Sequence, residues 1–212
     1  MSNKDTKDKI LSVAGALFAE NGYDSTSIRD ISKEAGVNLA SINYHFKNKL
    51  NLYREVMNAS ILNIQADVER LGTQSDNLKD FYWNLFKQFT DNQESFTNGF
   101  KLFMTNTLPV SEEIIPSACA EDFGPPGFKM MLELVTREVG EDTPLSGREW
   151  FVRTIFAYIC HSSLMMSCSF VKIMEDKVPF LQEDEKRRSI DNLVESSLNF
   201  LKEHPEKFST DV

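Results

Sequence analysis

This sequence has little of the residues that build disulfide-rich, zinc-binding or β-sheet proteins. Its three cysteines, Cys119, Cys160 and Cys168, are widely spaced and form no C-x-x-C pair. An odd and scattered set argues against both a disulfide framework and a zinc site. The 212 residues include only 9 glycines and 7 prolines, and alternating runs of valine, isoleucine and threonine are nearly absent. This shortage of turn residues and strand patterns predicts an all-α protein.

Long apolar runs are missing as well. The stretch closest to a membrane span, Thr154–Val171, has 18 residues without an acid or a base. Polar side chains are spread along it: Tyr158, His161, Ser162, Ser163, Ser167 and Ser169. We therefore expect a helix buried in a soluble bundle, with no membrane partner. The first nine residues, MSNKDTKDK, lack the apolar core of a signal peptide, and together with the few cysteines this predicts a cytoplasmic protein.

Motifs of catalysis are also absent. His161 follows Cys160 and precedes Ser162, but neighbouring residues on a helix point in different directions and form neither a triad nor a metal site. A single histidine on an apolar helix is more commonly a core residue with a satisfied hydrogen bond. No glycine-rich phosphate loop or paired-histidine motif occurs. We predict no enzymatic activity, no catalytic residue, no metal and no cofactor.

Two short helical patterns lie between residues 25 and 49. Ser27 and Asp30 have the spacing of a capping box at the start of the first. Ile28, Ile31 and Ala35 give it one apolar stripe. Gly36 follows at once, where a helix commonly ends in a left-handed conformation. The sequence predicts that the first helix ends there.

Asn38 is a suitable N-cap for the second helix. Its apolar residues, Leu39, Ile42 and Phe46, are predicted to share one buried face. The opposite face carries small or hydrogen-bonding side chains without an acid: Ala40, Ser41, Asn43 and Tyr44. Such a face lets a helix approach the major groove of DNA and pair with base edges. The arrangement is the sequence pattern of a helix-turn-helix.

An amphipathic helix over Asp8–Asn21 precedes the motif and ends at Gly22. We expect it to supply the third wall of a small core, since two short helices alone bury too little area. The predicted core residues are Phe18, Ile31, Val37, Leu39, Ile42 and Phe46. The predicted head domain comprises residues 1–48.

The segment DISKEAGV at 30–37, followed by INYHF at 42–46 and by Lys49, resembles the DNA-binding domain of TetR-type (tetracycline-repressor-like) transcriptional regulators. The resemblance covers roughly Lys7–Tyr53. It departs at Asn43, where the family most often has tyrosine, and at Ala40, where glycine or another small residue is usual. It implies an N-terminal head that binds double-stranded DNA and a larger helical body, residues 49–212, that binds a ligand and dimerises.

Charge agrees with this division. Residues 1–49 contain 7 basic and 6 acidic residues, whereas the rest contain 16 and 26, and the net charge is -9. An acidic body should touch DNA only through its head, although chance variation in an acidic protein explains the asymmetry equally well. We predict base-edge contacts from Arg29, Ser41 and Asn43. We predict backbone contacts from Thr26, Ser27, Tyr44, His45 and Lys49, and an interface that also includes Asn38 and Ala40.

The body is predicted to contain further helices. A fourth helix should begin at residue 48 or 49 and run to Leu71, joining head and body without a linker. Ser75 is the predicted cap of the next helix. The remaining expected helices cover residues 77–91, 93–106, 128–139, 147–174 and 184–202, with a loop over 108–127 that includes a short helical turn around 112–120.

Aromatic residues in the body leave room for a ligand site, although 16 phenylalanines also simply fill a core. The resemblance implies an apolar or aromatic small molecule, and the predicted lining is Phe86, Phe103, Met104, Phe156, His161 and Met165. The last helix carries an apolar stripe: Ile190, Leu193, Val194, Ser197, Leu198 and Leu201. This stripe faces either the chain's own core or, as the resemblance implies, a twofold copy.

The interpretation that follows is a homodimeric repressor that a small ligand releases from a palindromic operator. Two alternatives of other classes remain open. One is a helical enzyme or carrier whose head is vestigial. The other is a constitutive DNA-binding or protein-recruiting factor without a ligand.

Overall fold

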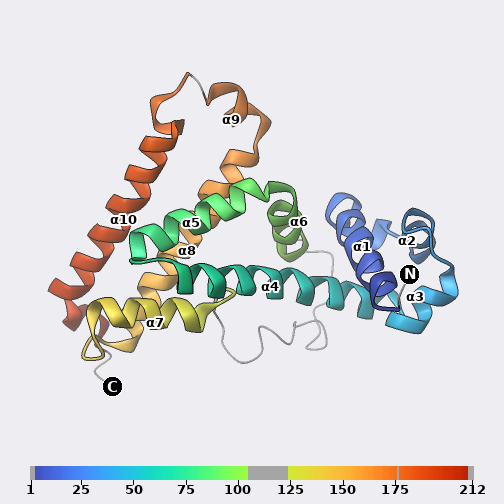
Figure 1. Ribbon diagram of the computed structural model, residues 1–212, viewed down its shortest axis with the longest axis horizontal. Helices are drawn as coiled ribbons and strands as arrows, with labels where there is room; N and C mark the ends of the chain where they lie inside the picture. Colours follow the sequence, from blue (N-terminus) through green and yellow to red (C-terminus); the bar gives the residue numbers. More distant parts are fainter. Residues whose placement is uncertain (1–2, 105–123, 176, 210–212) are drawn as a thin grey trace. The chain divides into compact units, whose positions relative to one another are not determined.

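The computed structural model describes residues 3–104, 124–175 and 177–209. Over these ranges it contains helices and no strand, which confirms the predicted all-α class. The expected helical turn around residues 112–120 and Cys119 lie outside the described residues. The longer helices are α1 (Asn3–Ser25), α2 (Ile28–Glu34), α3 (Leu39–Phe46), α4 (Lys49–Gln74), α5 (Leu78–Asp91), α6 (Gln93–Met104), α7 (Phe128–Val139), α8 (Leu145–Ser167), α9 (Ser169–Met174) and α10 (Glu183–Glu203) (Figure 1). Two short 3-10 helices follow α9 and α10: η3 (Pro179–Leu181) and η4 (Pro205–Phe208).

The described residues group into two compact units. Unit 1 contains residues 3–63 and 94–104, and unit 2 contains residues 64–93, 124–175 and 177–209. Helix α4 is continuous for 26 residues and contributes to both units. The predicted division after residue 48 differs from this grouping and stays a prediction.

Unit 1 is built on one hydrophobic core. Buried residues of α1, α2, α3, α4 and α6 form it, together with Ala35 at the end of α2: Ile10, Ala14, Phe18, Ile31, Ala35, Ile42, Phe46, Leu52, Tyr53, Val56, Met57 and Leu102. The Tyr53 hydroxyl donates a 2.8 Å hydrogen bond to the Leu102 carbonyl and so joins α4 to α6. The short helices of the head are therefore stabilised by tertiary packing rather than by their own length.

The predicted core of the head is confirmed at Phe18, Ile31, Ile42 and Phe46, which are at most 2% exposed. Val37 is only half-buried. The prediction for Leu39 is wrong, because this side chain is 39% exposed. Leu39 is the first residue of α3, so it lies at the edge of the packed face, whereas the two buried positions are four residues apart within the helix.

Several helix ends differ from the predictions. Helix α4 continues through Gly72 to Gln74. A Cβ on residue 72 would lie 2.8 Å from Cγ of Met130 on α7, so glycine at this position lets the two helices approach. Asn77, not Ser75, caps α5: its Oδ1 accepts a 2.9 Å hydrogen bond from the Asp80 amide. The end of α4 therefore differs from the prediction because of packing against α7, and the start of α5 differs because of the Asn77 side chain.

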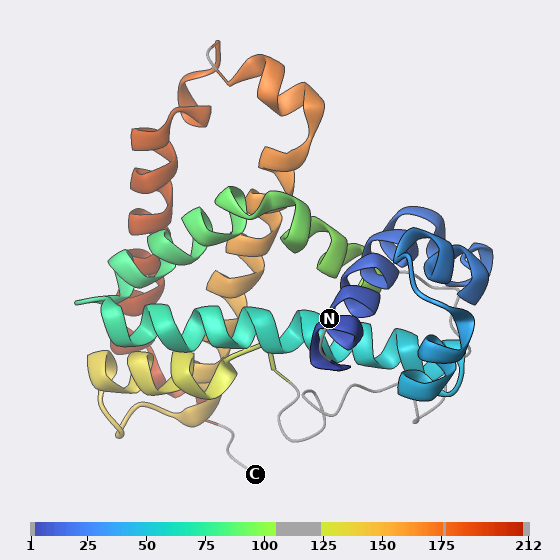
Figure 2. The same cartoon turned by 45° about the vertical axis from the view of Figure 1, so that its right-hand side comes forward.

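Unit 2 has α5 crossing α8 and α10, with α7 beside the last turns of α4, and both ribbon views agree on this arrangement (Figures 1 and 2). The fully buried side chains at its centre include Phe81, Leu85, Phe151, Ile155 and Val194. The stripe of α10 is buried in this unit at Ile190, Val194, Ser197, Leu198 and Leu201, whereas Leu193 is half-buried. The chain's own core thus occupies this stripe.

The prediction of one helix over residues 147–174 is wrong. The helix breaks at Cys168, whose backbone is extended (φ -69, ψ 130), and α8 and α9 lie on either side. Ser167 donates its hydroxyl to the Leu164 carbonyl at 2.6 Å, a local bond that competes with the helical pattern at this end.

Among the described residues, no helix is long and apolar enough to cross a membrane.

Candidate functional site

The start of α2 is fixed by a reciprocal capping box. The Asp30 amide donates to Ser27 Oγ at 3.1 Å, and the Ser27 amide donates to Asp30 Oδ2 at 3.0 Å. Hydrogen bonds from the Ser27 side chain and then from its backbone lower the pKa of the Asp30 carboxyl. The predicted capping box is confirmed, and Asp30 is held as an anion at the positive end of α2.

The turn between α2 and α3 is equally well defined. Gly36 has a left-handed φ of 60, as predicted. Ser32 donates its hydroxyl to the Val37 carbonyl at 2.6 Å. Asn38 then caps α3, since its Oδ1 accepts the Ser41 amide at 2.7 Å and the Ser41 hydroxyl at 2.9 Å. Local hydrogen bonds therefore set the direction in which α3 leaves the turn.

The outer face of α3 is accessible in this chain. Ala40, Asn43 and Tyr44 are exposed, with Tyr44 at 75%, and Ser41 and His45 are half-buried. The rings of Tyr44 and His45 meet edge to face with centroids 5.2 Å apart. The exposed predicted contacts in the preceding segment are Ser27, Arg29 and Asn38. This face offers hydrogen-bonding groups and no carboxylate of its own.

The predicted DNA contact from Thr26 is corrected by the structure. Its side chain is buried, with 2% exposure. The single proton of its hydroxyl is shared between the carbonyls of Gly22, at 2.8 Å, and Leu17, at 3.1 Å. These bonds close the end of α1, where Gly22 has a φ of 79 and interrupts the helix. Thr26 therefore stabilises the entry to the helix-turn-helix and is removed from the candidate interface.

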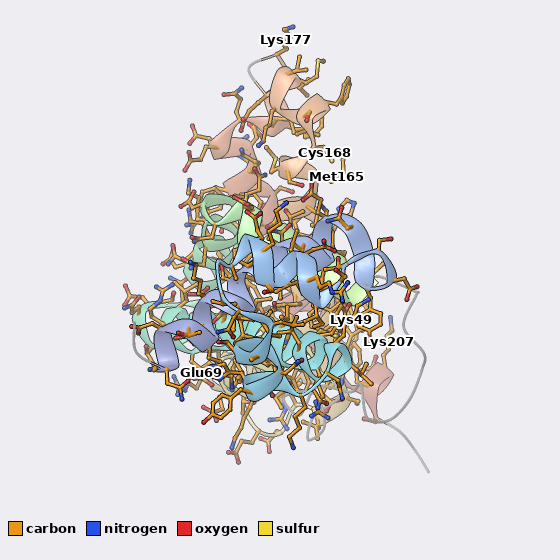
Figure 3. All side chains as sticks on the ribbon, turned by 90° about the vertical axis from the view of Figure 1, so that its right-hand side faces the viewer. Lys49, Glu69, Met165, Cys168, Lys177 and Lys207 are labelled. Atoms are coloured by element: carbon orange, nitrogen blue, oxygen red, sulfur yellow. The ribbon has the colours of Figure 1, made fainter. Side chains whose placement is uncertain are left out.

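Lys49, labelled in Figure 3, is the first residue of α4. Its Nζ lies 4.3 Å from the centroid of the Tyr23 ring and donates to the Asp24 carbonyl at 3.3 Å. Asn48 Oδ1 accepts the Asn51 amide at 2.8 Å and so caps the same helix end. The site thus places an ammonium group beside the N-terminus of a long helix, where anions are favoured.

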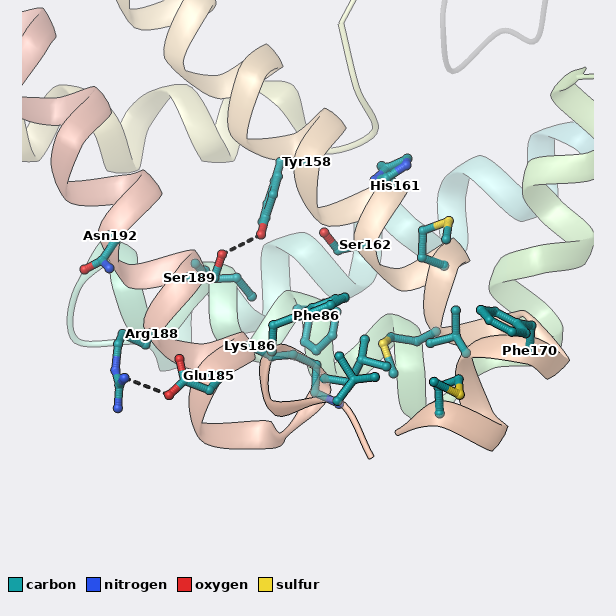
Figure 4. A pocket seen from close by; sticks show the side chains of 18 residues that line it. Phe86, Tyr158, His161, Ser162, Phe170, Glu185, Lys186, Arg188, Ser189 and Asn192 are labelled. Carbon is teal, nitrogen blue, oxygen red and sulfur yellow. Dashed lines mark hydrogen bonds and ion pairs between the residues drawn. The ribbon is translucent and has the colours of Figure 1, made fainter. Parts of the chain in front are cut away.

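Unit 2 contains an open cavity of about 830 Å³ between α5, the end of α8, α9, η3 and the start of α10 (Figure 4). Its apolar lining residues are Phe86, Met165, Met166, Phe170, Val171, Met174, Val178, Phe180, Leu181 and Ile190. Its uncharged polar lining residues are Tyr158, His161, Ser162, Ser189 and Asn192. The size and the apolar lining are those of a small-molecule site.

Only part of the predicted ligand lining belongs to this cavity. Phe86, His161 and Met165 line it. Phe103, Met104 and Phe156 do not: the first two are exposed residues of α6 in unit 1, and Phe156 packs against Phe89 with ring centroids 6.3 Å apart. The residues of α9 and η3 were missed, because their contribution depends on the break after α8. No local sequence signal placed them near α10.

The two cations at the cavity, and two of its hydroxyl groups, have partners nearby. Tyr158 and Ser189 share a 2.8 Å hydrogen bond between their hydroxyls, and Arg188 forms a 2.7 Å ion pair with Glu185 (Figure 4). Lys186, a further lining residue, pairs with Glu175 at 2.9 Å. Because each cation is neutralised by an adjacent carboxylate, the lining favours an uncharged ligand over an anion.

Cys160 and His161 differ strongly in environment. Burial raises the pKa of the Cys160 thiol to about 12, so the thiolate that nucleophilic chemistry requires is not formed at neutral pH. His161 is exposed and lines the cavity. The prediction that His161 is a core residue is therefore wrong. In the part of the chain that the structure describes, no cluster of three His, Cys, Asp or Glu residues could hold a metal ion.

Known proteins resemble this chain mainly in its N-terminal segment. Residues 10–56 match the profile of "Bacterial regulatory proteins, tetR family". The biofilm operon icaADBC negative transcriptional regulator IcaR of Staphylococcus epidermidis is 49% identical over 49 residues, which are 23% of this chain and 26% of IcaR. The HTH-type transcriptional regulator AcrR of Shigella flexneri is 43% identical over 61 residues, which are 29% of this chain and 28% of AcrR. This chain thus spans about a quarter of the length of the curated relatives it matches.

Solved structures share the fold along the whole chain. A tetR-family transcriptional regulator from Streptomyces coelicolor superposes with a TM-score of 0.65 at 15% identity, covering 100% of this chain and 92% of that one. The SmeT–triclosan complex has a TM-score of 0.60 at 17% identity and covers 91% of both chains. The N-terminal segment, residues 10–56, thus matches the DNA-binding domain of the TetR family, and the chain shares its all-α fold with solved structures of TetR-family regulators.

Proposed function

We propose that this protein is a cytoplasmic, homodimeric DNA-binding repressor that leaves a palindromic operator when a small apolar or aromatic ligand binds. The observation that carries the proposal is the outer face of α3, which is exposed, free of carboxylates and held in place by the Asn38 cap. Such a helix fits the major groove and can read base edges.

The contacts divide by chemistry. Asn43 is exposed and its amide can pair with an adenine edge, and Arg29 and Ser41 are the other candidates for base edges. Ser27, Tyr44, His45 and Lys49 are candidates for phosphate contacts, which fix position without reading sequence. Asn38 and Ala40 let the backbone of α3 approach the groove. The head, residues 1–48 in this division, would act as the reading unit.

Dimerisation is supported by function and by exposed apolar surface. A single head contacts too few bases to choose a site, whereas two recognition helices about 34 to 36 Å apart read successive major grooves. In unit 2, Phe170, Ile173 and Phe180 are 71%, 66% and 69% exposed. Phe170 and Ile173 are three residues apart on α9 and therefore lie on one face. A contiguous exposed apolar patch indicates an interaction surface. We therefore expect a second copy to cover part of the body.

Ligand release is supported by the cavity in unit 2. SmeT, which shares the fold, is known as a complex with triclosan, and IcaR is named a negative regulator. A ligand that prefers one body conformation lowers operator affinity only by its differential binding energy. Helix α4 runs without interruption from the head into unit 2 and is the proposed mechanical connection.

The test of the DNA proposal is selection of bound sequences from random duplexes with the full-length protein. We expect a palindrome with half-sites about one helical turn apart. Asn43→Ala should relax the preference at one base position of each half-site, whereas Lys49→Ala should weaken all sequences alike and reduce the salt slope by about one unit per head. Lys129→Ala, at an exposed lysine of α7, is the charge-matched control. Recovery of no sequence preference would favour an enzyme or carrier with a vestigial head.

The test of ligand release uses triclosan as the first probe, followed by other uncharged aromatic compounds. Titration into the complex with the recovered palindrome should lower operator affinity, and calorimetry on the free protein should show saturable binding. A protein whose operator affinity stays constant across the compounds that bind it would be a constitutive factor instead.

A further inference from the structure

Lys49 is held in place by an aromatic ring. Its Nζ lies 4.3 Å from the centroid of the Tyr23 ring and donates to the Asp24 carbonyl at 3.3 Å. An ammonium group over a tyrosine face is attracted by the quadrupole of the ring. Since a free lysine side chain samples many rotamers, these two contacts restrict where its charge can lie. An ammonium group has three donors, so donors remain for a phosphate.

Tyr23 is itself fixed by the core of unit 1. Its ring stacks on Phe18 at a centroid distance of 5.9 Å and meets Tyr53 edge to face at 5.2 Å. Both partners are 1% exposed. The Tyr53 hydroxyl is anchored to the Leu102 carbonyl at 2.8 Å, and burial raises its pKa to about 12, which keeps it a donor at neutral pH. The ring under Lys49 therefore packs against two buried partners, one of which is anchored by a hydrogen bond.

The backbone that carries Tyr23 is fixed as well. Gly22 adopts φ 79 and ψ 168, which redirects the chain at the end of α1. The Thr26 hydroxyl then bonds the carbonyls of Gly22 and Leu17 at 2.8 and 3.1 Å. The segment from Gly22 to Thr26 thus presents both the Tyr23 ring and the Asp24 carbonyl to one lysine.

We propose that Tyr23 is a positioning residue for DNA binding, whose ring holds the Lys49 ammonium group ready for a backbone phosphate. The inference rests on the proposed function and adds a residue that does not itself touch DNA. A cation that is ordered before binding loses less side-chain entropy when the complex forms. The effect of Tyr23 on affinity must therefore pass through Lys49.

The first test changes the electronics of the ring at constant shape. Tyr23→Phe keeps the ring face, and Tyr23 is then replaced by phenylalanines with one, two and three fluorine atoms, which progressively remove the negative face. Affinity is measured for the recovered palindrome and for an unrelated duplex of equal length. We expect Tyr23→Phe to bind like the natural protein and the trifluorinated form to bind both duplexes about 2- to 5-fold more weakly per head. A flat response across the series overturns the inference.

The second test is a double-mutant cycle. Tyr23→Leu should weaken DNA binding in the natural background and have no effect in a Lys49→Met background, where the charge is absent. Tyr53→Phe is the matched control for simple destabilisation, because it removes the bond to Leu102 and leaves the contact between Tyr23 and Lys49. Equal losses from Tyr23→Leu in both backgrounds would assign the residue to folding alone.

The proposed function and the role of Tyr23 would be refuted by different results. If the natural protein binds no DNA at all, the proposed function is refuted, and the role of Tyr23 in DNA binding is refuted as well. If the natural protein binds its palindrome but neither the fluorine series nor the cycle shows coupling to Lys49, only the role of Tyr23 is refuted. If Tyr23→Leu does not fold, the fluorinated series decides by itself, since these rings keep the packing with Phe18 and Tyr53.

Discussion

Thr26 shows how one hydroxyl in the head can be committed to structure rather than to recognition. Its side chain is 2% exposed and donates to the carbonyls of Leu17 and Gly22. Replacing a buried hydroxyl by a methyl group of similar volume lowers the free energy of unfolding, because the carbonyl acceptors lose their donor. Its neighbour Ser27 is exposed and caps α2, so adjacent residues of similar chemistry have different roles.

Thr26→Val should therefore lower stability rather than directly alter DNA contacts. We expect a loss of about 1–2 kcal/mol in the free energy of unfolding, because the carbonyl partners lose a donor. Thr26→Ser, which keeps the hydroxyl, should lose less. Urea denaturation measures both, and operator affinity is measured at a temperature where each variant is folded. Reduced affinity with unchanged stability would restore Thr26 to the interface.

At the scale of elements, helix α7 begins and ends at a glycine with an unusual backbone conformation. Gly127 at the start of α7 and Gly140 at its end both have positive φ, 76 and 86. A Cβ on Gly127 would lie 2.5 Å from Val68 Cγ1, whereas a Cβ on Gly140 meets nothing within 4 Å. The two ends of one helix thus both need a positive φ, with ψ 19 at Gly127 and ψ 162 at Gly140, and they differ in the space around them.

Gly140→Ala should cost about 1–3 kcal/mol from the backbone alone, because φ 86 with ψ 162 lies in a region that is essentially confined to glycine. Gly127→Ala should cost about 1–2 kcal/mol for its left-handed backbone. The clash should add roughly 1–3 kcal/mol, because Val68 is fully buried and cannot move without disturbing the core. Shortening the neighbour with Val68→Ala should recover part of that added cost in a double variant. Urea denaturation of the natural protein, the three single variants and the double variant tests this, and no recovery of stability in the double variant would contradict the role of the clash.

The contact between α5 and α10 is also electrostatic and predicts a dependence on pH. Arg187 donates to Asp80 at 2.7 Å and to Asp191 at 2.9 Å. Hydrogen bonding from Arg187 is the main cause that lowers the pKa of Asp80 below its ordinary value of 3.8. Because the folded-state pKa is the lower one, this contribution is present above the unfolded pKa and is lost as pH falls through the folded pKa.

Asp80→Asn should thus lower stability at neutral pH and flatten the loss of stability below about pH 4. Asp142→Asn, an exposed carboxylate after α7, is the control and should leave the acid dependence unchanged. Thermal unfolding between neutral and acidic pH measures both slopes. Since Asp80 is 39% exposed as a side chain, solvent screening keeps the effect small, and parallel profiles for Asp80→Asn and the natural protein would refute it.

At the scale of the whole molecule, the proposed regulator joins a reading face in unit 1 and a cavity in unit 2 through one continuous helix. Ser162 lines the cavity from α8 and is half-buried. Ser162→Trp should fill part of the space of about 830 Å³ and leave the outer face of α3 unchanged. Ligand response and DNA binding are therefore separable by one substitution.

We expect Ser162→Trp to keep operator affinity within about 2-fold and to weaken the effect of a releasing ligand by at least about 10-fold, equivalent to about 1.4 kcal/mol. Ser95→Trp, at an exposed position of α6 outside the cavity lining, is the matched control. Fluorescence anisotropy of a labelled operator with increasing ligand measures both. An unchanged ligand response in Ser162→Trp would place the effector elsewhere.

The sequence by itself determined the all-α class and the local geometry of the helix-turn-helix. The capping box of Ser27 and Asp30, the left-handed Gly36 and the Asn38 cap were all predicted correctly. Each depends on hydrogen bonds or backbone conformations within three or four residues, so short-range spacing contains the necessary information.

Only the tertiary structure decided which side chains are buried and which line the cavity. Thr26 is buried where exposure was expected, and Leu39 is exposed where burial was expected. After the break at Cys168, residues of α9 line the same cavity as the start of α10, whereas Phe103 does not line it. These outcomes depend on partners many residues away in the chain, and a helical pattern specifies a face without specifying what packs against it.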